Sequence, residues 1–169
     1  MGIEDRVLVE YLRRSYHVGD GLWFVKVEEE RGFGEALELD RRVWEVLAKI
    51  QARKARELME CRGNEAEALA QCFGPKLTAD GHAFRMETTP EAVRITLPEC
   101  PWLALLRKAG RAHLASREGE TVCFTEGRTW CAEFGGEWEF DMPERACSGG
   151  QRCVMHFAAL PPLPALRAN

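Results

Sequence analysis

Several signatures of well-known protein classes are missing from the chain. Its 169 residues contain no phosphate-binding glycine loop, no Rossmann glycine motif and no nucleophile elbow. No apolar run approaches the length needed to cross a bilayer. The N-terminal residues 1–6 lack the basic-then-apolar pattern of a signal peptide. These absences argue against a nucleotide-binding fold, an α/β-hydrolase and a membrane partner.

Charge of one sign is not concentrated anywhere along the chain. The net charge is −4, and basic residues are interspersed with acidic ones. Because nucleic-acid binding requires a basic patch, we expect no nucleic-acid partner. Seven cysteines, an odd number, in a chain without an export signal indicate a reducing compartment. Thiols there are more often metal ligands or reactive groups than disulfides, so we expect a cytoplasmic protein.

What is present is the composition of a folded domain. Apolar residues make up 46% of the chain and charged residues 30%, and there is no internal repeat, low-complexity block or linker. A chain of this length can bury a sizeable core. We therefore predict a single domain over residues 1–160, followed by an irregular proline-rich tail at 161–169.

The hydrophobic periodicity changes at Gly74-Pro75. Before it, apolar residues recur at helical spacing, and after it two segments alternate at period two around Thr89-Pro90-Glu91, as in a hairpin. The predicted helices span about 3–16, 20–31, 35–59, 64–72, 101–110 and 121–134, and the predicted strands about 83–88, 92–97, 137–142 and 153–157. This order predicts an α+β fold, in which N-terminal helices pack on one antiparallel sheet of about four strands.

Three cysteines and a glutamate form a candidate metal site. Glu144, Cys147 and Cys153 flank the turn Gly149-Gly150. Cys123 lies upstream, on a predicted helix. Adjacent glycines allow a tight reversal that brings flanking thiolates together, and zinc takes four ligands from Cys, His, Asp and Glu. The spacing alone is equally compatible with two buried cysteines beside a hairpin and a surface glutamate.

The same residues, followed by Val154-Met155-His156-Phe157, resemble the 4-vinyl reductase domain family. Its members are small-molecule-binding domains found alone and as sensor modules of bacterial regulators of aromatic degradation. The resemblance implies a fold of that type and an apolar effector pocket beside a zinc ion. It also implies the zinc ligands, which are Cys123, Glu144, Cys147 and Cys153. A homodimer is the expectation for this family type.

A second resemblance covers nearly the whole chain. It rests on Asp20-Gly-Leu-Trp-Phe-Val-Lys-Val-Glu-Glu, Leu39-Asp-Arg-Arg-Val-Trp, Ile50-Gln-Ala-Arg-Lys, Cys100-Pro-Trp, Gly110-Arg-Ala-His113 and Cys147-Ser-Gly-Gly. These segments are similar to a family of prokaryotic proteins often labelled L-2-amino-thiazoline-4-carboxylate hydrolase-like. The resemblance implies a helix-rich domain related to the 4-vinyl reductase type, and the label implies hydrolytic opening of a cyclic thiazoline.

Cys100 offers an alternative chemistry. It stands at the start of a predicted helix, where the helix dipole favours a thiolate, and His113 could accept its proton in a Cys–His nucleophile pair. The simpler interpretation is a capped helix start with a partly buried thiol and a surface histidine. Alternatively, Cys100 replaces Glu144 among the metal ligands, and four thiolates hold zinc or an iron–sulfur cluster.

Residues 17–24 combine polar and aromatic side chains that could contact a ligand. If a pocket opens between this segment and the sheet, Trp23 and Phe24 line it and His17 or Asp20 orients a polar group. Trp102 is a further candidate for the wall. The alternative is a helix cap followed by ordinary core aromatics.

Three functions are compatible with these patterns. The first is a cytoplasmic small-molecule-binding protein with a structural zinc site beside an apolar pocket. The second is a hydrolase that attacks a cyclic thiazoline-type C=N bond through Cys100 or a metal-bound water. The third is a protein-interaction subunit. We favour the first, because a metal with four protein ligands has no open position for water.

Overall fold

The computed structural model describes residues 4–161, so that residues 162–169 of the predicted tail lie outside the described part. The helices are α1 (Asp5–Arg31), α2 (Phe33–Leu58), α3 (Ala66–Ala79), α4 (Pro101–Lys108) and α5 (Ala115–Glu133), with short 3-10 turns η1 (Ala112–Leu114) and η2 (Ala146–Ser148). The strands are β1 (Arg85–Thr89), β2 (Ala92–Leu97), β3 (Trp138–Glu144) and β4 (Cys153–Ala159). No helix within residues 4–161 combines the length and apolarity of a membrane span.

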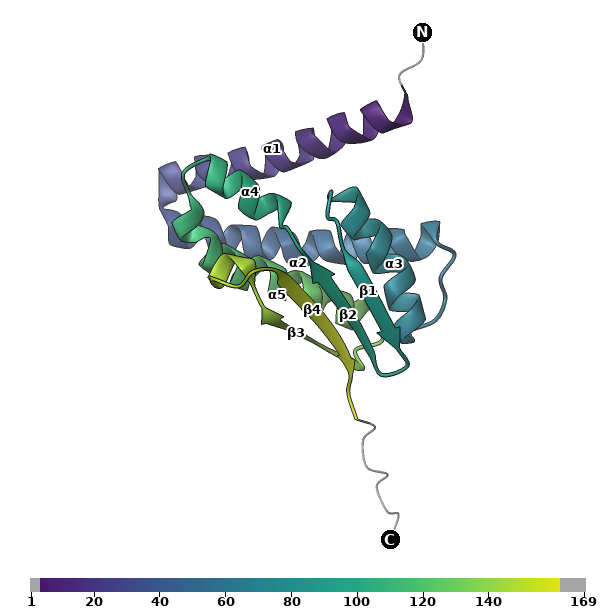
Figure 1. Ribbon diagram of the computed structural model, residues 1–169. Helices are drawn as coiled ribbons and strands as arrows, with labels where there is room; N and C mark the ends of the chain where they lie inside the picture. The colour runs from purple at the N-terminus through teal and green to yellow at the C-terminus, as the bar shows by residue number, and fades with distance from the viewer. Residues whose placement is uncertain (1–3, 162–169) are drawn as a thin grey trace.

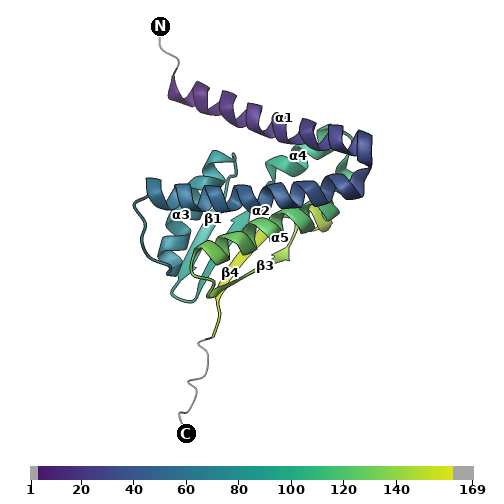
Figure 2. The same cartoon turned by 180° about the vertical axis from the view of Figure 1, so that it is seen from behind.

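The α+β fold is confirmed. The four strands form one antiparallel sheet in the order β1-β2-β4-β3, which brings the predicted hairpin beside the C-terminal strand. Helices α2 and α5 cover one face of this sheet, α3 lies over its β1 end, and α1 crosses above α4 (Figures 1 and 2). The other face carries polar side chains such as Arg94 and Asp141, which are exposed.

The core lies between the sheet and helices α2, α3 and α5. Alternate residues of β2 and β4 point into it, as the period-two pattern predicted. The ring of Phe73 on α3 meets Trp130 of α5 edge-on at 4.8 Å and Phe157 of β4 at 5.1 Å, centroid to centroid. Gly127 lets α5 approach the sheet closely, because a Cβ there would overlap the ring of Phe140. This close contact fixes the position of α5 against the sheet, and with it the positions of the side chains on the neighbouring turns of the helix.

Two predicted helix breaks are wrong. Residues 5–31 form one continuous helix, so Asp20 is an interior residue and not an N-cap. Burial of His17 and Phe24 on one face holds the helix together through Gly19 and Gly21. Helix α3 likewise continues through Gly74-Pro75 to Ala79. Gly74 is buried there beside Phe84, and this packing offsets the backbone hydrogen bond that a proline removes.

Candidate functional site

A cavity of about 500 Å³ lies between α1, α2, α4, α5 and one end of the sheet. Its walls are mainly apolar, with Leu103 and Leu106 from α4, Val122 from α5, and Met142 and Met155 from the sheet. A smaller number of polar side chains interrupts these walls. Because the surrounding elements are far apart in sequence, only the folded chain creates this space.

Helix α1 contributes one wall of the cavity. His17, Asp20, Gly21 and Phe24 line it, and their spacing of three and four residues places them on one face of the helix. These include three of the predicted ligand-contacting residues. Trp23 is absent from the wall, because it points to the opposite side of α1 and is 48% exposed.

Aromatic rings form the part of the wall next to α1. Trp102, the second residue of α4, lies 4.4 Å from the ring of His17 and meets the ring of Trp44 edge-on at 5.9 Å, centroid to centroid. Tyr16 meets Trp102 edge-on at 6.0 Å and lies 5.5 Å from the ring of His17, centroid to centroid. This ring joins α4 to α1 and α2 and lines the cavity, and its contact with a ligand stays a prediction.

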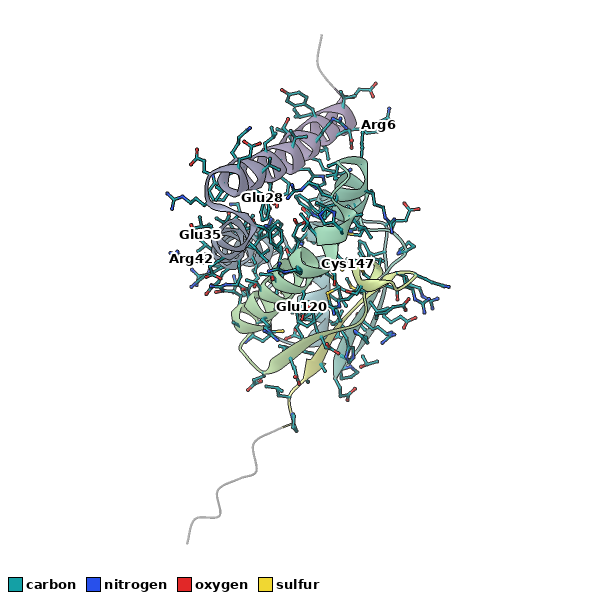
Figure 3. The ribbon with its side chains drawn as sticks, turned by 90° about the vertical axis from the view of Figure 1, so that its left-hand side faces the viewer. Arg6, Glu28, Glu35, Arg42, Glu120 and Cys147 are labelled. Atoms are coloured by element: carbon teal, nitrogen blue, oxygen red, sulfur yellow. The ribbon has the colours of Figure 1, made fainter. Side chains whose placement is uncertain are left out.

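Four thiols line the opposite end of the cavity. They are Cys100 before α4, Cys123 on α5, Cys147 in η2 and Cys153 at the start of β4. Cys147 lies beside α5 (Figure 3), where a Cβ on Gly119 would stand 2.8 Å from its sulfur. Cys153 accepts a hydrogen bond from the amide of Ala146 at 3.4 Å. The glycine at position 119 thus makes room for η2 against the helix.

Burial raises the pKa of Cys100, Cys123 and Cys153, and charges on the neighbouring thiols raise them further. All three are therefore protonated at neutral pH in the absence of a metal. The metal expectation remains a prediction, because no three Cys, His, Asp or Glu side chains within residues 4–161 are grouped closely enough to hold an ion.

The fourth predicted ligand, Glu144, is not brought to the three cysteines in the described chain. Its carboxylate accepts hydrogen bonds from Arg152 Nε at 2.9 Å and from the amide of Gln151 at 3.2 Å. The guanidinium of Arg152 holds the pKa of this carboxyl below its usual range. Cys100 is the residue that joins Cys123, Cys147 and Cys153 at the cavity, as in the four-thiolate alternative.

The structure does not bring His113 to Cys100. His113 is exposed on η1 and is absent from the cavity wall. The amides of Trp102 and Leu103 lower the pKa of the Cys100 thiol, but burial is the larger effect and the net shift is upward. The predicted Cys–His pair therefore has neither the proximity nor the thiolate that nucleophilic catalysis requires.

A buried group of ionisable side chains borders the thiol end and was not predicted. Lys76 Nζ lies 3.0 Å from Asp80 Oδ2 and also forms an ion pair with Glu126. Burial would lower the pKa of Lys76, but the two carboxylates raise it above its ordinary value. Burial and the charge of Lys76 lower the pKa of the nearby His82 to about 4. Lys76 and Asp80 are one helical turn apart, and this spacing could have indicated the ion pair. Because we expected the helix to end before Gly74-Pro75, the spacing was not recognised.

Three carboxyl groups lie toward the α1 end. Asp20, Asp40 and Glu118 come from α1, α2 and α5. Burial raises the pKa of Asp20 to about 6 and that of Asp40 to about 7, and Asp20 and Glu118 also raise the value for Asp40. Burial raises the pKa of Glu118 against the opposing charge of Arg111. Asp40 and Glu118 were not predicted, since nothing local distinguishes them from surface acids.

The chain belongs to a family of unknown function, DUF6125, which matches residues 5–102. The matched part runs from α1 to the start of α4 and includes Asp20, Asp40 and Cys100. The other three thiols of the cavity, Cys123, Cys147 and Cys153, follow the matched part. No curated protein matches the sequence.

Proposed function

We propose that the protein binds a small organic molecule in the cavity between α1, α2, α4 and α5. The cavity itself carries this proposal: it has about 500 Å³, mostly apolar walls and a few polar groups. Ligand pockets of soluble proteins have about 300–1,000 Å³ and the same mixture of walls. The positions of His17, Asp20, Phe24 and Trp102 on the wall support it, and so does the resemblance to the 4-vinyl reductase domain family.

A cavity-filling variant tests this proposal. Leu106→Trp places an indole in the cavity, whereas Leu58→Trp places one on α2 where the side chain is 69% exposed. A ligand at a hundred times its Kd stabilises a protein by about 2.7 kcal/mol. We expect compounds that raise the Tm of the wild type and of Leu58→Trp to lose this effect in Leu106→Trp. Equal shifts in both variants, or no stabilising compound in a broad screen, would contradict the proposal.

We further propose that Cys100, Cys123, Cys147 and Cys153 hold a zinc ion at the thiol end. This set replaces the one with Glu144, whose carboxylate is engaged by Arg152. Four thiolates satisfy zinc, and metal binding would displace the protons that burial retains on Cys100, Cys123 and Cys153. Coordination would require η2 to move toward α4 and α5. Gly149, which follows η2 at φ 96°, provides the backbone flexibility for this movement.

Elemental analysis of purified variants checks the metal. We expect about one zinc per chain in the wild type, in Glu144→Gln and in Cys61→Ser, whose thiol lies outside the cavity, and almost none in Cys123→Ser or Cys147→Ser. Iron and labile sulfide in place of zinc would indicate the iron–sulfur alternative. Loss of metal from Glu144→Gln, or its absence from zinc-supplemented wild type, would reject this ligand set.

The seven free thiols fit a reducing, cytoplasmic setting.

A hydrolase acting on a cyclic thiazoline-type C=N bond is the second candidate. Cys100 lies on the cavity wall, and Lys76, Glu126 and His82 offer acid–base groups beside it. Turnover of 2-amino-thiazoline-4-carboxylate by the wild type, abolished in Cys100→Ala but retained in Cys147→Ser, a variant of another proposed zinc ligand, would favour attack by Cys100. Tight binding without turnover would leave the binding function.

A protein-interaction subunit is the third candidate. Leu8, Leu12 and Trp23 lie on the face of α1 opposite the cavity and are 45–56% exposed. Ser15 and Gly19 stand between them on the same face, where small side chains permit close approach of another helix. This apolar outer face of α1 supports a homodimer in which two α1 helices pack together.

A further inference from the structure

The charged side chains around the cavity differ in whether they have a partner of opposite charge. Asp40 lines the cavity with only 8% of its surface exposed, and Asp20 lines it from α1. Neither carboxyl forms an ion pair with any side chain in residues 4–161, and the indole of Trp44, one turn along α2, is the polar neighbour of Asp40. A buried carboxylate without a countercharge is costly, so this end of the cavity lacks a positive charge.

The cations of the wall cannot supply that charge. Each buried or half-buried one already has a carboxylate partner: Lys76 pairs with Asp80 and Glu126, Arg111 with Glu28, and Arg145 with Glu120. Glu28 occupies its position near the C-terminal end of α1 (Figure 3). Arg14 and Lys108 also border the cavity, but both are exposed to solvent. An anionic ligand would therefore meet no free buried cation among residues 4–161.

The aromatic wall lies next to these carboxyls and points to the same kind of ligand. Trp44 and Trp102 line the cavity, and aromatic rings attract organic cations. His17 is 8% exposed, and its Nε2 has no hydrogen-bond partner within residues 4–161. Burial lowers the pKa of this imidazole, so it is neutral and can accept a hydrogen bond from an ammonium group.

We propose that the cavity takes an organic cation, a protonated amine on an apolar body, whose charge lies between Asp20 and Asp40. This inference rests on the proposed binding function and names the class of its ligand. Glu118, facing Asp40 from α5, adds to the negative potential, while Arg111 beside it is neutralised by Glu28. The apolar body would contact Leu106, Val122 and Met155 toward the thiol end.

Three probes of similar shape and different charge test the ligand class. They are phenethylammonium, 2-phenylethanol and phenylacetate, titrated calorimetrically into the full chain at pH 8, where both aspartates are ionised. We expect phenethylammonium to bind about tenfold more tightly than the alcohol, and phenylacetate to bind most weakly. Equal or tighter binding of either other probe, or no binding of phenethylammonium, overturns the proposal.

Asp40→Asn keeps the shape of the side chain and removes its charge. We expect this variant to lose about tenfold in affinity for phenethylammonium and, with it, the preference for this cation over 2-phenylethanol. Asp141→Asn, exposed on the far face of the sheet, should bind both as the wild type does. An unchanged preference for the cation in Asp40→Asn overturns the assignment.

The neutral dye Nile red separates this inference from the proposed function. If Nile red binds the wild type and is displaced by 2-phenylethanol but not by phenethylammonium, the cavity binds ligands and the cation inference fails alone. If neither the dye nor any of the three probes binds, both proposals fail.

Discussion

Asp40 illustrates how much a single side chain in this protein depends on its surroundings. Its carboxyl lies among Trp44, Asp20 and Glu118; the residue is 8% exposed, and no cation of residues 4–161 pairs with it. These surroundings raise its pKa to about 7, so near neutral pH a substantial part of the native population retains a proton that an ordinary aspartate has lost. The same carboxyl is then both a cost to folding and an attraction for a positive ligand.

Replacing Asp40 by asparagine should therefore stabilise the protein at high pH. Because the folded-state pKa of Asp40 lies above the value of 3.8 for an unfolded chain, ionisation favours the unfolded state. The free energy of unfolding should fall as pH rises from about 4 to about 7 and then level off for this group. We expect Asp40→Asn to match the wild type at pH 4 and exceed it by about 1–3 kcal/mol at pH 8.

Urea unfolding at several pH values measures this difference. Asp141→Asn serves as the control, since that carboxyl is exposed and its replacement should leave the pH slope unchanged. The interpretation fails if Asp40→Asn keeps the slope of the wild type. In Asp40→Asn, part of the pH dependence of the unfolding free energy should remain, because Asp20 has a pKa raised to about 6.

The residue scale also marks the limit of prediction from sequence. His17, Asp20 and Phe24 could be selected because they are near one another in the chain, and helical spacing places them on one face. Asp40 and Glu118 could not, because their significance arises only when α2 and α5 meet α1. Glu144 was selected by its place beside the glycine turn, yet Arg152, eight residues on, holds it elsewhere.

At the scale of whole elements, the connection between α1 and α2 is a single residue. Gly32 ends one helix and begins the next at φ 83° and ψ 161°, a conformation essentially restricted to glycine. It reverses the chain without a loop, so α1 folds back over α2. The placement of the α1 wall of the cavity depends on this one backbone conformation.

Two glycine substitutions in the same region should have opposite effects. Gly32→Ala should lower the free energy of unfolding by about 1–3 kcal/mol through backbone strain, although no further atom of the described chain lies within 4 Å of the added Cβ. Gly19→Ala, inside α1 and equally uncrowded, should raise it by about 0.5–1 kcal/mol through helix propensity. Thermal and urea unfolding of both variants measure the pair. A neutral Gly32→Ala would show that α1 and α2 do not require this turn.

The elements themselves were predicted well where periodicity was strong and poorly where local signals competed with packing. The hairpin of β1 and β2 and the long helix α2 match their predictions within a few residues. The expected breaks near Asp20 and at Gly74-Pro75 followed local rules for caps and proline. Burial of His17, Phe24 and Gly74 against distant parts of the chain outweighed those rules.

At the scale of the whole molecule, the apolar outer face of α1 predicts self-association. We expect the wild type to sediment with twice the mass of one chain. Leu12→Glu places a charge in the centre of this face, where the side chain is 56% exposed, and should weaken the dimer by about tenfold or more. Leu58→Glu, at the end of α2 and 69% exposed, should leave it intact. A monomeric wild type would contradict this prediction.

The two sides of helix α1 thus belong to two different proposed interactions. Its inner side supplies His17 and Asp20 to the cavity, and its outer side carries Leu12 and Trp23. Because a helix moves as a rigid body, a displacement of the inner side of α1 also displaces its outer side. A guest molecule that tilts α1 on entering should consequently alter how readily two subunits join, and joining should alter how tightly the guest is held, by the same factor in both directions.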